Sequence, residues 1–417
     1  MSDMARVKKV ELHLHLEGAA QPDFIRQIAF EKKVDLSGIF TAQGGYDIHD
    51  FVHFLRVYEA ATSVLTTPED YARLTRSVLE ASAGHGVVYC ETFLSPDFCG
   101  GGDIGAWREY LSAMTEAADA AERDFGITMR GVITAVRHFG PDQAKRAARC
   151  AAETAGRMIC GFGMAGDEKI GHVRDFSWSF DCAAEAGLPF TIHAGEWGGA
   201  QSVRETLDAY NPPRIGHGVE AISDPDLVAR LADTGVVLEC CPVSNVFLGV
   251  FPNWKSHPLA RLREAGVKVT VSTDDPPFFH TNMSREYEAL EQHFGWAETE
   301  FTEINQTALA AAFCDEETRA RVAKRAVSRA ACSWRVTAGL AAPILRATGS
   351  KKPAQCQATN RQNHEQSHAT RIHPWRHRRY PSCGGLRQWR RIEQRPEDRR
   401  PRRQHARLSL HHLPQHP

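Results

Sequence analysis

Eight short apolar runs within the first 275 residues constrain the fold of this chain more than any other feature of its sequence. The runs cover residues 7–15, 86–95, 127–136, 158–166, 188–196, 214–219, 236–245 and 267–275. Most gaps between them carry helical periodicity, as at residues 107–123, 141–155, 177–186 and 224–233. Strands that alternate with helices form a parallel sheet. Eight such units predict a closed (β/α)₈ TIM barrel of the α/β class.

A doubly wound open sheet is the alternative, and the count of eight strand–helix units favours the closed barrel over it. Helical stretches at residues 284–294, 301–313 and 316–332 follow the eighth run and predict additional C-terminal helices. The longer gap after the first run contains an amphipathic stretch at residues 47–61, DIHDFVHFLRVYEAA. This stretch is suited to pack over the mouth of a barrel.

Charge divides the chain into an acidic body and a basic tail. Residues 351–417 hold 16 Lys and Arg against 4 Asp and Glu, a charge of +12, so residues 1–350 carry −13. The tail has almost no aliphatic periodicity and cannot bury enough apolar surface to order itself. We predict a barrel domain over residues 1–335 and a disordered basic tail over residues 341–417. The acidic body argues against a surface for nucleic acid.

The tail has three interpretations. Its richness in Arg, His, Pro and Gln favours an out-of-frame translation of a GC-rich gene. Ordinary disorder is the second interpretation. The third is a functional basic arm, which keeps a nucleic-acid-binding protein with an inert barrel as an alternative function.

We expect a cytoplasmic protein without a membrane partner. No stretch reaches the ~18 consecutive apolar residues of a membrane helix, and the N-terminus lacks the apolar core of a signal peptide. The 11 Cys residues form no C-x-x-C pair. Most of them are therefore expected to be free thiols in a reducing compartment.

Ionisable side chains gather at the ends of four predicted strands: His13 and His15, His193 and Glu196, His217, and Asp274 and Asp275. Residues i and i+2 of a strand share a face, so His13 and His15 should point the same way. By the same rule, Asp275 should point away from Asp274 if the strand continues. Because the active site of a TIM barrel lies at the carboxyl ends of its strands, the four ends should meet at one rim.

Three His and one Asp form a ligand set that suits Zn²⁺, with Fe²⁺ or Co²⁺ as alternatives. A catalytic metal keeps a position open for water and lowers the pKa of that water toward ~7. Glu196 is left over as a proton donor. Each of these His and Asp residues, taken alone, has a plainer interpretation: a buried His that is hydrogen-bonded within the core, or an Asp that caps a helix. Their occurrence on four separate strands favours a metal site.

Six motifs occur in the order seen in the adenosine/adenine deaminase family of metal-dependent amidohydrolases, which the chain resembles over about residues 9–321. They are VELHLHLEGA, GFGMAGDE, TIHAGE, RIGHGV, CPVSN and VSTDDP. The resemblance implies a (β/α)₈ barrel with one Zn²⁺ per chain and a role in purine salvage. It also implies hydrolytic removal of the purine 6-amino group, with zinc-activated hydroxide attacking C6.

The resemblance also implies roles for single residues, with zinc ligands at His13, His15, His193 and Asp274. It implies a catalytic set of Glu196, which protonates N1, His217, which positions the hydroxide, and Asp274. Substrate would be contacted by His15, Glu17, Gly166 and Asp275, with the Gly166 backbone at N3 and Asp275 at N7. Phe51, Phe54 and Leu55 of the stretch 47–61 resemble an apolar lid.

Position 17 bears on the substrate. Adenosine-specific members of the family commonly have Asp at this position, near the ribose 5′-hydroxyl, whereas members that act on free adenine commonly have Glu. Other segments, SPDFCGGGD and VSTDDPPFFHT, do not look like the adenine-specific pattern. We therefore expect adenosine and 2′-deoxyadenosine as substrates, with adenine or another 6-aminopurine as the alternative.

Overall fold

Eight parallel strands form a single closed sheet in the computed structural model, which describes residues 3–327. They are β1 Lys9–His15, β2 Val87–Leu94, β3 Thr128–Val136, β4 Ile159–Ala165, β5 Phe190–Ala194, β6 Arg214–His217, β7 Val237–Cys240 and β8 Lys268–Val271. Each strand pairs in parallel with the next one along the chain. Backbone bonds from His15 N–H to Asp274 O and from Asp274 N–H to His13 O join the two ends of the sheet. The predicted TIM barrel is confirmed.

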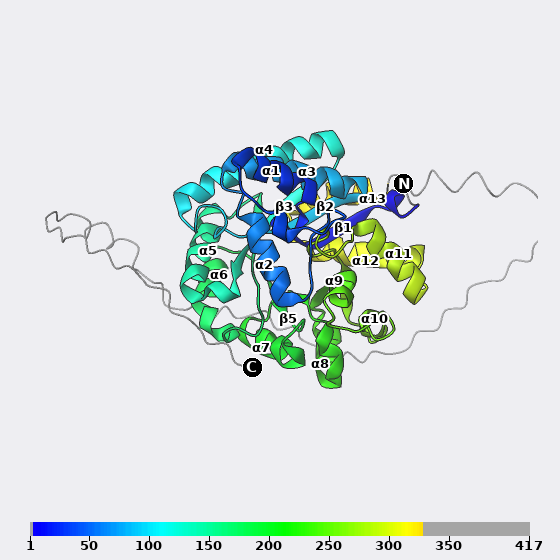
Figure 1. The fold of residues 1–417 in the computed structure, drawn as a ribbon. Helices are drawn as coiled ribbons and strands as arrows, with labels where there is room; N and C mark the ends of the chain where they lie inside the picture. The colour runs from blue at the N-terminus through cyan, green and yellow to red at the C-terminus, as the bar shows by residue number, and fades with distance from the viewer. Residues whose placement is uncertain (1–2, 328–417) are drawn as a thin grey trace, which may run out of the picture. The chain divides into compact units, whose positions relative to one another are not determined.

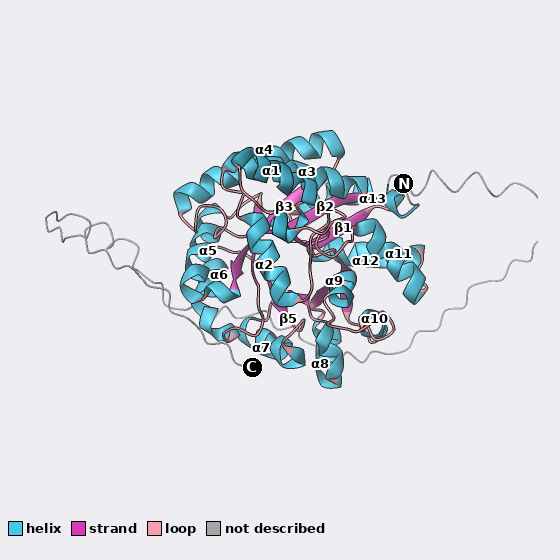
Figure 2. Cartoon of the chain, viewed as in Figure 1, coloured by secondary structure: helices cyan, strands magenta, loops and turns pink. Residues whose placement is uncertain are grey.

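Helices surround the strands (Figures 1 and 2). They are α1 Pro22–Lys32, α2 Phe51–Thr62, α3 Pro68–Gly84, α4 Ile104–Phe125, α5 Pro141–Thr154, α6 Ser177–Glu185, α7 Gly199–Tyr210, α8 Pro225–Thr234, α9 Pro242–Phe247, α10 Leu259–Glu264, α11 Met283–Phe294, α12 Glu298–Ala311 and α13 Glu316–Val327. Helix α2 lies across the centre of the ring in Figure 1. This is the position expected for the amphipathic stretch 47–61, and the Asp50 side chain caps the helix by accepting from His53 N–H.

The last two strands end earlier than the apolar runs predict. The run 236–245 extends beyond β7, because Pro242 begins helix α9. Proline is favoured in the first helical turn and has no N–H to give to a sheet. Strand β8 likewise ends at Val271, although its predicted run continues to residue 275. The residues after these two strands are therefore free to adopt backbone conformations that a strand forbids.

Helices α11, α12 and the described part of α13 confirm the prediction of additional C-terminal helices. Asn305 of α12 accepts a hydrogen bond from Val10 N–H of β1 at 2.8 Å, and buried side chains of α12 and α13 pack against the amino-terminal parts of β1 and β2.

The predictions for the tail at residues 341–417 lie outside the described residues. The domain division into 1–335 and 341–417 stays a prediction. Within residues 3–327, no helix is long and apolar enough to cross a membrane.

Candidate active site

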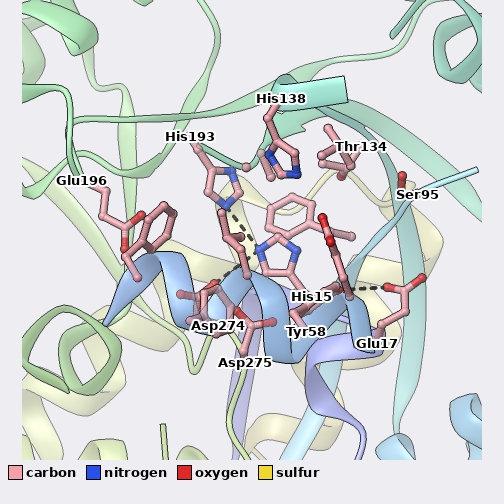
Figure 3. Close-up of a pocket in the computed structure, with 18 of the residues that line it drawn as sticks. His15, Glu17, Tyr58, Ser95, Thr134, His138, His193, Glu196, Asp274 and Asp275 are labelled. Atoms are coloured by element: carbon pink, nitrogen blue, oxygen red, sulfur yellow. Dashed lines mark hydrogen bonds and ion pairs between the residues drawn. The ribbon is translucent and has the colours of Figure 1, made fainter. Parts of the chain in front are cut away.

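A cavity lies at the carboxyl ends of the strands, with one polar and one apolar wall (Figure 3). The polar wall contains His15, His193, Glu196, His217, Asp274 and Asp275. The apolar wall includes Phe51, Phe54, Leu55 and Tyr58 of α2. Phe54 also packs against Phe278 and Phe279, with ring centroids 5.7 and 5.1 Å apart. The predicted strand-end residues therefore meet at one rim, under an aromatic cover.

Four donor groups converge beneath this cavity. His15 Nε2 lies 3.3 Å from both His193 Nε2 and Asp274 Oδ1, and His13 Nε2 lies 3.4 Å from the same Asp274 oxygen. Ligands at 2.0–2.1 Å from a tetrahedral ion place their donor atoms about 3.3–3.4 Å apart. The buried His13 Nε2 has no hydrogen-bond partner among the described residues, and buried nitrogens seldom lack one. The geometry and the orphaned nitrogen fit a buried metal site of three imidazoles and one carboxylate.

His217 also lies near this centre. A donor atom of His217 falls within 4.8 Å of those of His13, His193 and Asp274. Its Nε2, however, lies 3.8 Å from Glu196 Oε2, on the side of the cavity. His15 has the shorter donor-to-donor spacings, but His217 completes the same group, so both are candidates for the third imidazole and the assignment of His15 stays a prediction.

Glu239, on β7, holds His13 from below the metal site. Its Oε2 lies 3.0 Å from His13 Nδ1 and accepts from Thr191 Oγ1 at 2.8 Å, while its Oε1 pairs with the buried Arg214 at 2.6 Å. Burial opposes ionisation of Glu239, but Arg214 and the bond to His13 outweigh it and lower the pKa of the carboxyl. A carboxylate that accepts a hydrogen bond from the Nδ1–H of an imidazole leaves the opposite nitrogen free to bind a metal. Sequence analysis missed Glu239, although a lone Glu inside an apolar run was a usable signal.

The network around Glu239 gives a first prediction. Glu239→Gln should weaken zinc binding by about 10- to 100-fold, because the amide no longer fixes the orientation of the His13 ring. Competition against a chromophoric chelator measures this affinity, and thermal unfolding reports on the fold. The control is Thr191→Val, which removes one hydrogen bond to Glu239 and should weaken zinc binding less. Equal zinc affinity in Glu239→Gln and the unchanged protein would refute the role.

Asp274 and Asp275 both line the cavity, so the expectation that Asp275 faces the opposite side is wrong. The reason is local: β8 ends at Val271, and Asp274 adopts a left-handed backbone with φ of 68°. The alternation of a strand no longer applies at such a residue. A Cβ on Gly18 would lie 1.5 Å from Asp275 Oδ1, so only glycine leaves room for this carboxyl.

The cavity shifts the pKa values of three ionisable side chains: Glu196, Asp275 and His217. Burial raises the pKa of Glu196 well above its usual value, and the charges of Asp274 and Glu168 add to the effect. Burial, with Asp274 and Glu196, does the same for Asp275. Burial lowers the pKa of His217 to about 3. These shifts favour the protonated form of the two carboxyls and the neutral form of the imidazole, whose Nδ1 lies 3.3 Å from the Asn245 amide nitrogen.

Glu17 lies on the side of the cavity away from Glu196 (Figure 3). It accepts hydrogen bonds from Tyr71 Oη at 2.9 Å and from Tyr58 Oη at 3.4 Å, one on each carboxyl oxygen. Burial outweighs these bonds and raises the pKa of Glu17 to about 7. Gly166 also lines the cavity. Its φ is +95°, and an added Cβ would lie 2.7 Å from His138 Nδ1, so glycine is required there.

A TIM barrel with a buried site of three His and one Asp at its carboxyl rim defines a metal-dependent amidohydrolase. A family model described as adenosine deaminase matches residues 8–328. The chain belongs to the adenosine/adenine deaminase family, as the sequence motifs predict, and is a hydrolase that deaminates purines.

Two relatives in this family carry a narrower name. An adenine deaminase of Rhizobium leguminosarum bv. trifolii (strain WSM2304) is 50% identical over 314 residues, which are 75% of this chain and 97% of the relative. An adenine deaminase of Chelativorans sp. (strain BNC1) is 48% identical over 317 residues, 76% of this chain and 97% of the relative. Between the two predicted substrates, these relatives favour the alternative, adenine, over adenosine.

Solved structures support the fold and the metal site. The crystal structure of adenine deaminase from Arthrobacter aurescens matches with a TM-score of 0.70 at 28% identity, over 77% of this chain and 98% of that chain. An amidohydrolase from Burkholderia ambifaria, solved with bound Zn, matches with a TM-score of 0.69 at 26% identity, over 78% of this chain and 90% of that chain.

Proposed function

We propose that this chain is a zinc-dependent adenine deaminase, which converts adenine and water to hypoxanthine and ammonia. The observation that carries the proposal is the near-half identity to adenine deaminases over almost their whole length. Glu17 and its two tyrosines add a physical argument. They engage each other at the cavity wall, where a ribose would need open polar partners, so a free base fits this wall better than a nucleoside.

Zinc suits the ligand set of His13, His15, His193 and Asp274, because imidazole nitrogen and carboxylate oxygen are ligands that it favours. When bound, zinc lowers the pKa of a water molecule toward ~7, which makes a nucleophile available at neutral pH. Glu239 holds His13, and Ser244 Oγ donates to Asp274 Oδ2 at 2.8 Å. These contacts hold two of the ligands in place.

The other residues of the site carry protons and orient the purine. Glu196, held protonated by burial, gives its proton to N1 as the water oxygen adds to C6. His217, neutral and adjacent to the Asn245 amide, positions the attacking water. Asp275, also protonated, donates to N7, which can only accept. The Gly166 backbone contacts N3. The proton that the water loses on addition restores Glu196 to its acid form. The hydroxyl proton at C6 then passes to the amino nitrogen as the bond from C6 to that nitrogen breaks, so that ammonia leaves and C6 becomes a carbonyl.

A substrate panel tests the proposal directly. Ammonia release is measured with adenine, adenosine, 2′-deoxyadenosine and AMP on protein whose metal content is known. Adenine should show the highest kcat/KM, with adenosine lower by about 100-fold or more, since Glu17 and Tyr58 bond each other at the cavity wall and would have to separate to bind a ribose. A higher kcat/KM for adenosine would contradict the proposal and restore the original expectation.

Glu17→Asp gives a second prediction. Shortening this side chain by one methylene frees space at the cavity wall, and one methylene is worth about 10–200-fold in discrimination. The ratio of kcat/KM for adenosine to that for adenine should therefore rise by about tenfold or more. Tyr71→Phe is the matched control, because it removes a hydrogen bond to Glu17 without opening the same space. An unchanged ratio in Glu17→Asp would show that Glu17 does not exclude the sugar.

A further inference from the structure

Glu168, three residues beyond β4, is bonded to an unusual set of donors. Its carboxylate accepts from four consecutive backbone N–H groups, those of residues 195–198, at 2.5–3.1 Å. The Ser202 hydroxyl also donates to it. Glu168 is 7% exposed and does not line the cavity. One buried carboxylate therefore accepts hydrogen bonds from every backbone N–H of the turn between β5 and α7.

This arrangement has a local cause. The N–H groups that precede and begin a helix have no partner within it, and the positive end of the helix dipole favours an anion there. Bonds from N–H groups to a charged acceptor are stronger than neutral ones. The turn allows the close approach because Gly198 has no side chain: a Cβ there would lie 2.7 Å from Glu168 Oε1.

Glu196 is the second residue of this turn. Its backbone N–H donates to Glu168 Oε2 at 3.1 Å, while its own side chain lines the cavity and lies 3.8 Å from His217. Displacing the turn would move the Glu196 carboxyl relative to a bound purine. A misplacement of about 1 Å in a reacting group costs on the order of 100-fold in rate.

We infer that Glu168 is a positioning residue, which anchors the turn at residues 195–198 and so holds the Glu196 carboxyl at the purine N1. The inference rests on the proposed function for the role of Glu196. The charge of Glu168 also contributes to the raised pKa of Glu196, after burial and Asp274. Glu168 thus holds the Glu196 carboxyl in position and helps to keep it protonated, although Glu168 itself touches no substrate.

Glu220 provides a matched comparison. It also accepts a backbone N–H from the same segment, but only that of Gly199, at 2.5 Å. Like Glu168 it is absent from the cavity wall. Glu168→Gln should therefore disturb the turn, because the new amide places N–H donors against backbone donors. Glu220→Gln should leave residues 195–198 in place.

A double-mutant cycle in the full-length zinc-loaded protein tests the inference. Glu168→Gln should lower kcat for adenine by about 100-fold, with KM changed far less, zinc content unchanged and a smaller effect for Glu220→Gln. In a Glu196→Gln background, the same Glu168→Gln change should cost little more, because the group it positions is already disabled. If the fold loss in kcat of the double variant equals the product of the two single losses, the inference is overturned. A loss of activity matched by a loss of zinc would overturn it as well.

Hydrogen exchange supplies a readout independent of turnover. Amides 195–198 should exchange faster in Glu168→Gln than in the unchanged protein, whereas Glu220→Gln should keep their slow exchange. Equal exchange in Glu168→Gln overturns the inference even if adenine is deaminated normally. If the unchanged protein deaminates no purine of the panel, the proposed function fails instead, whatever the exchange data show for the turn.

Discussion

Glu196→Gln should lower kcat for adenine by about 1,000-fold while zinc stays bound, which fits the 10²–10⁴-fold contribution of a positioned proton donor. The amide fills the same space but has no acidic proton to give to N1. Because Glu196 lies 3.8 Å from His217 and is not a member of the ligand set, the metal content should not change. Steady-state ammonia release together with metal analysis measures both quantities.

The pH dependence of the unchanged protein checks the same group. Burial raises the pKa of Glu196 well above its usual value, and the carboxyl must be protonated to act as the acid. Activity that depends on Glu196 should therefore be highest below that raised pKa and decline as the pH rises through it. Near-normal turnover by Glu196→Gln, or an alkaline decline that persists in this variant, would assign the acid elsewhere.

Asp274→Asn should release the metal and with it the activity. Its Oδ1 lies 3.3–3.4 Å from the ring nitrogens of His15 and His13, and the amide removes the only negative charge of the ligand set. Zinc sites gain roughly 10–16 kcal/mol from four ligands. Losing one charged ligand should then weaken binding by on the order of 100- to 1,000-fold.

Metal analysis after dialysis, followed by adenine turnover with and without added zinc, measures this effect. Asp275→Asn is the control, since Asp275 lies beside the site but is assigned to the purine. It should keep its zinc and lose turnover only. Full zinc content and normal turnover in Asp274→Asn would exclude Asp274 as a ligand.

Strand periodicity and strand-end chemistry were enough to predict the barrel and a buried metal site of three His and one Asp. His13 and His15 share a face of one strand, so the i and i+2 rule placed both at the rim. The rule failed at Asp275, because the turn after β8 has left the strand conformation. The early end of β7 at Cys240, with Pro242 beginning α9, shows the same limit, since apolar content alone does not reveal where a strand ends and a helix begins.

Glu239 and Glu168, which hold other residues of the site in position, could not be predicted from the sequence for a different reason. Glu239 acts on His13, 226 positions away, and Glu168 acts on a turn nearly 30 positions away. Nothing in the spacing of either residue indicates its partner; only the closed barrel brings them together. The choice between adenine and adenosine had a signal in the sequence, Glu17, but two other segments were given more weight, and the relatives favour the alternative that Glu17 indicated.

Two side chains of the site, His217 and Asp274, sit on backbones with φ of 59° and 68°. Such a backbone conformation costs a residue other than glycine about 1–3 kcal/mol of conformational free energy. A cost of this size is a large fraction of the free energy of unfolding of a typical protein. Glycine at either position would relieve the backbone cost but would remove a side chain of the site, so heat resistance selected without a test of deamination would come at the expense of turnover.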